Sequence, residues 1–81
     1  MNAKRAAAMV ATEHRYIVRV LVELTELCTT YVSDRVSKRD SSVSKQRLDD
    51  FFQARVPELV GIDTHEFAIY LVMYLFENRR R

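Results

Sequence analysis

The stretch 62–76, IDTHEFAIYLVMYLF, decides the fold because it joins a helix start signal to the unbroken apolar run 67–76. A helix of this composition is apolar on every face, so it is either buried on all sides or spans a membrane. Ten residues at a rise of ~1.5 Å cover only about half of a ~30 Å hydrocarbon core, which favours burial. We therefore expect a core helix over residues 63–78.

The entry into this helix carries two local signals. Asp63 followed by Glu66 is a capping box, and Ile62 before the cap can pack on Phe67 as a hydrophobic staple. Upstream, Pro57 suits the first turn of a short helical segment that Gly61, the single glycine, would close in the left-handed conformation. The sequence thus predicts a tight corner directly before the core helix.

Composition and periodicity predict an all-α fold. The chain has 81 residues, 48% of them apolar, with one Pro and one Gly and no alternating runs of β-branched residues. One apolar stripe, with steps of 4, 3, 4 and 3, comprises Ile17, Leu21, Leu24, Cys28 and Tyr31. A second stripe comprises Leu48, Phe51, Phe52 and Val56. We predict three main helices, 12–34, 45–56 and 63–78, packed as a small orthogonal bundle around the all-apolar last helix.

The predicted core joins these three helices. It consists of Leu24, Leu27, Phe51, Phe52, Phe67, Leu71 and Leu75. Residues 1–81 make a single domain, which is either complete or a piece of a longer protein. Residues 1–11 favour helix but lack an apolar stripe, so they are either ordered or a frayed extension of the next helix. The segment 34–44 is rich in Ser and charge, and we expect a mobile linker there with Ser44 capping the second helix.

The core helix is apolar on several sides, and two amphipathic helices would bury only part of its apolar surface. Either the chain self-associates, most simply as a dimer, or chain outside this sequence covers the rest. We expect the contact surface on the last helix, at Tyr70, Met73, Tyr74 and Phe76. This pattern is typical of a non-catalytic protein-interaction module with a protein partner.

The residues that carry catalytic chemistry are few and badly placed for it. A single cysteine, Cys28, forms no internal disulfide, which favours an intracellular protein of the cytoplasm or nucleus. His14 and Cys28 would lie ~21 Å apart along one helix, too far for a dyad, and His65 is expected as an ordinary exposed residue. We therefore expect no enzyme activity, no metal and no cofactor.

Basic residues give a second functional class. Between residues 35 and 47 the net charge is +4, and the chain ends in three arginines. The candidate contact residues are Arg35, Lys38, Arg39, Arg79, Arg80 and Arg81. The alternative to a protein-interaction module is therefore a small helical protein that binds nucleic acid through this segment and the tail. Because no aromatic side chain is interleaved to stack a base, a solvated surface is the preferred interpretation.

The order of features resembles the beginning of the P-type, phosphate-signalling cyclins of fungi, plants and protists. An amphipathic helix and a Ser-rich linker precede Phe52 and Pro57, and the helix that follows carries the pairs 70–71 and 74–75, both Tyr-Leu. In that family these positions lead into the cyclin box, whose later helices are absent here. The resemblance, over residues 16–76, implies an N-terminal piece of a protein that binds and activates a cyclin-dependent kinase, without most of the kinase-binding surface.

Overall fold

The computed structural model describes residues 2–13 and 15–79, and this part of the chain is all-helical. It contains α1 (Ala3–Thr12), α2 (Val18–Val36), α3 (Ser42–Arg55), the short 3₁₀ helix η1 (Pro57–Leu59) and α4 (Thr64–Arg79). The predicted all-α class is confirmed. The predicted core helix is α4, shifted by one residue at each end.

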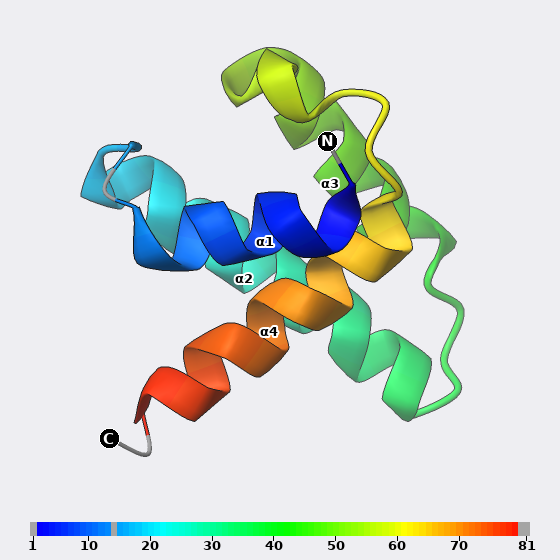
Figure 1. Ribbon diagram of the computed structural model, residues 1–81. Helices are drawn as coiled ribbons and strands as arrows, with labels where there is room; N and C mark the ends of the chain where they lie inside the picture. The colour runs from blue at the N-terminus through cyan, green and yellow to red at the C-terminus, as the bar shows by residue number, and fades with distance from the viewer. Residues whose placement is uncertain (1, 14, 80–81) are drawn as a thin grey trace.

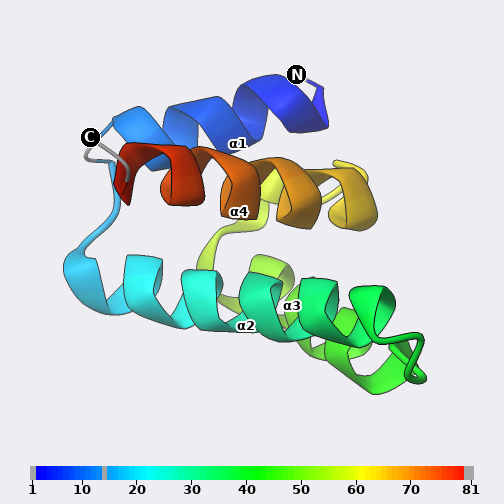
Figure 2. The same cartoon turned by 90° about the horizontal axis from the view of Figure 1, so that it is seen from below.

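The helices form two layers. In Figure 2, α1 and α4 lie side by side in one layer, and α2 and α3 form the other. Figure 1 shows that α2 and α4 cross each other rather than run alongside. Because α4 contacts α1, α2 and α3, it is the helix on which the others pack, as its composition predicted.

The alanine-rich start forms a helix of its own, so the described chain has four α-helices where three main helices were predicted. Four small residues on one face of α1 are buried: Ala3, Ala6, Ala7 and Val10. Their spacing of three to four residues makes one continuous stripe, and small side chains let the backbones of α1 and α4 approach closely. At its start, the Asn2 side chain accepts a hydrogen bond from the Arg5 backbone N–H at 2.8 Å.

The predicted helix 12–34 is therefore wrong at its start. Thr12 ends α1, the chain turns, and α2 begins only at Val18. Ile17, predicted on the buried stripe, is the N-cap residue of α2 and is 67% exposed. A helix face is buried only where a neighbouring helix covers it, which the 4-3-4-3 spacing alone does not specify.

Five of the seven predicted core residues are buried, namely Leu24, Phe51, Phe52, Phe67 and Leu71. Leu27 and Leu75 are half-buried and pack against this cluster. The rings of Phe52 and Phe67 meet edge to face at 5.2 Å, which links α3 to α4. One cluster of buried side chains thus connects all four α-helices and η1.

The corner before α4 has the predicted local structure. Gly61 has a φ of 93°, and Pro57 begins η1. Asp63 Oδ1 accepts a hydrogen bond from the Glu66 backbone N–H at 2.9 Å, and Ile62 packs against the core. These contacts fix the direction in which α4 enters the core.

The connection between α2 and α3 is shorter than the predicted linker 34–44. Only residues 37–41 lie between the two helices. Arg39 Nε donates to Asp34 at 3.1 Å, and Asp40 Oδ1 accepts from the backbone N–H and the hydroxyl of Ser42. Ser44, predicted as the cap, lies inside α3 instead. The Asp40 side chain accepts the hydrogen bond from the first backbone N–H of the helix in its place.

Candidate interaction surfaces

The four predicted contact residues of α4 lie on two different sides of the helix. Tyr70 and Tyr74 are half-buried and stack with ring centroids 6.3 Å apart. Lys4 of α1 lies over the Tyr70 ring at 5.8 Å, so these two tyrosines border α1. Met73 is 48% exposed and Phe76 is 59% exposed. Only the latter two present large apolar area to solvent.

A second set of exposed apolar side chains lies at the start of α2. Glu23 forms an ion pair with Arg55 and thereby marks the side of α2 that faces α3. By helical spacing, Val18 and Val22 lie on the other side of α2, away from α3. In Figure 2, α2 and α4 both lie in front, with no other helix over them. We call this surface the α2–α4 face; by helical spacing its exposed apolar residues are Val18, Val22 and Val36 of α2 with Met73 and Phe76 of α4.

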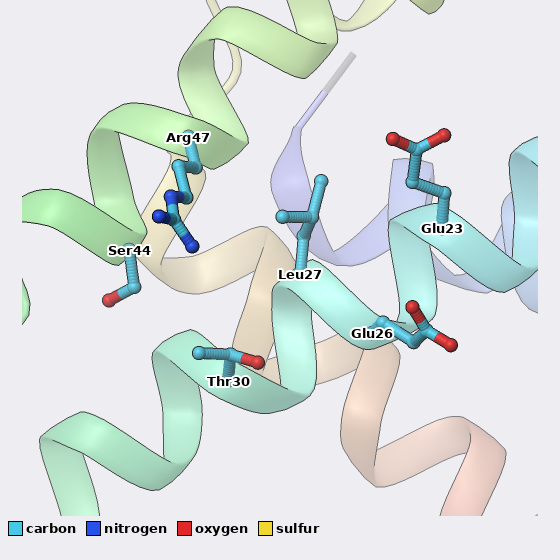
Figure 3. Close-up of a pocket in the computed structure, with 6 residues that line it drawn as sticks. All are labelled: Glu23, Glu26, Leu27, Thr30, Ser44 and Arg47. Atoms are coloured by element: carbon cyan, nitrogen blue, oxygen red, sulfur yellow. The ribbon is translucent and has the colours of Figure 1, made fainter.

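A polar groove of about 240 Å³ separates α2 from α3 (Figure 3). Its lining residues are Glu23, Glu26, Leu27, Thr30, Ser44 and Arg47. Arg47 reaches from α3 beside Leu27, whereas the two glutamates lie beyond Leu27. The groove therefore holds charges of both signs and two hydroxyl groups, without an acid–base pair or a nucleophile in a reactive arrangement.

A smaller apolar pocket lies where α1, residues 15–16 and η1 meet. It measures about 120 Å³ and is lined by Ala6, Met9, Val10, Arg15, Tyr16, Glu58 and Leu59. At its mouth the Tyr16 hydroxyl donates a hydrogen bond to Glu58. Burial and this hydrogen bond raise the pKa of Tyr16 to about 12. No local sequence pattern predicts this contact, because it joins two segments 42 residues apart.

The predicted basic contact residues do not form one uniformly positive surface. Arg35, Lys38 and Arg39 are exposed around the end of α2, but Arg39 is ion-paired with Asp34. Hydrogen bonds from the Ser42 backbone and hydroxyl lower the pKa of the neighbouring Asp40, so it is anionic at neutral pH. Of the tail, Arg80, Arg81 and the Arg79 side chain lie outside the described residues.

The titratable side chains of the core are engaged in packing. Cys28 is buried, and burial raises the pKa of its thiol to about 12, which keeps it protonated at neutral pH. His65, predicted as an ordinary exposed residue, is half-buried, with Nδ1 2.6 Å from the hydroxyl oxygen of the buried Tyr31. Tyr31 lies on the predicted stripe, but only the crossing of α2 and α4 brings His65 to it.

Two observations on the structure and one comparison with known proteins bear on function. Within residues 2–13 and 15–79, no group of three His, Cys, Asp or Glu side chains is arranged to hold a metal ion. No helix in the same part of the chain combines the length and hydropathy needed to cross a bilayer. Comparison of the chain with protein-family models, curated proteins and solved structures gives no match. The resemblance to P-type cyclins therefore stays a prediction.

Proposed function

We propose that the chain is a non-catalytic protein-interaction module and that its contact surface is the α2–α4 face. The observation that carries this proposal is the exposure of Met73 and Phe76 at the end of α4, although α1, α2 and α3 all pack on that helix. With Val18, Val22 and Val36 they make five large apolar side chains on one face. Such an accumulation is typical of protein-binding surfaces.

The chemistry of the remaining side chains supports a non-catalytic role. Cys28 is a protonated, buried thiol, and His65 lies against the Tyr31 hydroxyl. The polar groove between α2 and α3 offers Arg47 and two glutamates without a neighbouring nucleophile. The cyclin resemblance gives this proposal a specific form, in which the partner is a cyclin-dependent kinase and the binding is regulatory.

The alternative of nucleic-acid binding through the basic segment has less support. A phosphate-binding surface needs clustered positive charge. Here Asp34 and Asp40 alternate with Arg35, Lys38 and Arg39, and one of the three cations is already paired. Salt distinguishes the two functions, because phosphate binding weakens steeply between low and physiological ionic strength, whereas apolar docking changes little.

Site-specific photo-cross-linking tests the proposal. A benzophenone side chain replaces Met73 in one sample of the full chain and Val43 in a control. Val43 is 63% exposed on α3, outside the α2–α4 face. Both are irradiated in cell extract and with purified cyclin-dependent kinase. We expect protein adducts from position 73 that persist at high salt. Adducts equally abundant from position 43, or none from position 73, would contradict the proposal.

A further inference from the structure

The apolar pocket between α1 and η1 combines buried apolar walls with a charged mouth. Three of its lining residues, Ala6, Val10 and Leu59, are no more than 8% exposed, and Met9 beside them is half-buried. Their side chains offer no hydrogen bond to water, so an apolar group that displaces water from the pocket gains free energy. The pocket is therefore suited to receive an apolar body from solution.

The volume of the pocket limits the size of that body. It measures about 120 Å³, whereas a dry apolar cavity of ~150 Å³ in another protein binds benzene, a body of six carbon atoms. In proportion, this pocket holds about four to five carbon atoms, the size of a short branched alkyl group. A helix of a partner protein, ~10 Å across, is too wide to enter it. The occupant that fits is a small molecule.

The mouth of the pocket favours a cation. Arg15 is already ion-paired with Glu13, with 2.7 Å between Nε and Oε2. Within residues 2–13 and 15–79 Glu58 makes no ion pair, and its Oε1 accepts a hydrogen bond from the neutral Tyr16 hydroxyl. Tyr16 stays protonated at neutral pH, because burial and this hydrogen bond raise its pKa to about 12. A carboxylate has about four acceptor sites, so Glu58 Oε2 can accept from a charged donor as well.

We propose that this pocket binds a small primary alkylamine, whose chain of about four to five carbon atoms lies against Val10 and Leu59 while its ammonium group donates to Glu58. Alkylamines are cations at neutral pH, as the Lys side chain is. A short fatty acid would set a second carboxylate against Glu58, and an apolar side chain of a partner protein would bring no cation to it. The site lies apart from the α2–α4 face, so this inference is independent of the proposed function.

An NMR titration of the full 81-residue chain tests the site, with ¹³C-labelled methionine methyl groups as reporters and 3-methylbutylamine at neutral pH as the probe. Met9 lines the pocket, whereas Met73 lies on α4 outside it and serves as the internal reference. We expect a saturable shift of the Met9 methyl signal with little change at Met73. The dissociation constant should be on the order of 1 mM, which is reasonable for a ligand of six non-hydrogen atoms.

Two further compounds separate the contribution of the apolar body from that of the charge. Methylamine carries the ammonium group without the body, and 3-methylbutanoate carries a similar body with the opposite charge. Each should bind at least about tenfold more weakly than 3-methylbutylamine, because each lacks one of the two interactions. Equal binding of 3-methylbutanoate would contradict the role assigned to Glu58, and equal binding of methylamine would contradict the role of the apolar walls.

A pair of glutamine variants identifies the carboxylate that holds the amine. Glu58→Gln keeps an oxygen that can accept from Tyr16 but removes the charge, so it should raise the dissociation constant about five- to tenfold. The matched control is Glu26→Gln, in the groove between α2 and α3, which should change it less than about twofold. Both glutamates are exposed, so both variants are expected to fold, and circular dichroism checks this.

Three results would overturn the amine site at this pocket. They are a Met9 signal that does not shift at 20 mM 3-methylbutylamine, a Met73 signal that shifts as far as that of Met9, and a Glu58→Gln variant that binds as tightly as Glu26→Gln. None of them bears on the α2–α4 face, which the cross-linking from position 73 tests separately.

Discussion

The two sides of α4 differ in how they are covered, although both are apolar. On one side, α1 packs against the helix, Lys4 lies over the Tyr70 ring, and Tyr70 and Tyr74 are half-buried. On the other side, Met73 and Phe76 remain about half exposed. Small side chains bury a helix face because they let the two backbones approach closely. Burying the exposed side of α4 would need larger side chains from another segment. The apolar run 67–76 predicts how much of the α4 surface must be buried, but not which segment of the chain buries it.

The largest effect should come from placing the same charge on the two sides of α4. Leu71 is buried and Met73 is half exposed, two residues apart on one helix. Leu71→Asp leaves an unpaired carboxylate in the core and should cost more than about 4 kcal/mol, comparable to the whole stability of a small domain. Met73→Asp should cost less than about 1 kcal/mol. Urea unfolding of the two variants measures the difference, and equal losses would contradict the assignment of the sides.

A larger side chain on α1 should break the close approach to α4. Ala7 is fully buried in the α1 stripe, so Ala7→Leu should destabilise the fold by about 1–3 kcal/mol through overpacking. The same substitution at the exposed Ala54 of α3 is the control and should be nearly neutral. Thermal unfolding followed by circular dichroism compares them. If Ala7→Leu is as neutral as the control, the small residues of α1 do not pack closely against α4.

A smaller effect is expected at the cap that directs α4 between its two sides. Asp63→Ala removes the acceptor of the Glu66 N–H hydrogen bond and should cost about 0.5–2 kcal/mol. Asp63→Asn keeps an acceptor in place and should recover most of that loss. Chemical denaturation at neutral pH measures both variants. An asparagine variant as unstable as the alanine variant would show that the hydrogen bond is not the cause.

The smallest effect concerns the α2–α3 connection, far from either side of α4. The pKa of Asp40 is lowered in the folded chain, so its contribution to stability is present above its ordinary value of 3.8 and is lost as the pH falls through the lowered value. Asp40→Asn cannot titrate. The natural chain should therefore lose slightly more stability than this variant between about pH 5 and about pH 2.5. Parallel urea titrations at the two pH values detect it, and identical losses would contradict it.

The parts of the fold that could be predicted were those set by local chemistry. Asp63, Gly61 and Pro57 specify a cap, a left-handed turn and a first helical turn through their own backbone and side-chain properties, and all three occur as predicted. Leu24 is buried because any packing of an apolar stripe buries its centre, and Phe67 is buried because it lies on the helix that is apolar on every face. Local sequence signals also predicted the connections between α2 and α3 and between α3 and α4, although not their lengths.

The parts that could not be predicted depend on contacts distant in sequence. An alanine stripe carries little hydrophobic signal, so α1 emerges only once α4 is available to pack against it. The half-burial of Tyr70 beside α1 and the exposure of Met73 one turn later follow from that same packing, as does the pairing of Tyr31 with His65. The assignment of the contact surface to α4 stays a prediction, and the exposed apolar residues Val18 and Val22 beside it on α2 became apparent only in the structure.

The most direct test of the open side of α4 is the oxidation rate of the Met73 thioether in pulsed hydroxyl-radical labelling, with Met9 of α1 as the internal reference. Mass spectrometry of the full chain at about 1 µM gives the ratio of the two rates. We expect Met73, which is 48% exposed, to be oxidised more readily than the half-buried Met9. A Met73 protected as well as Met9, or better, would contradict the exposure of this side of α4.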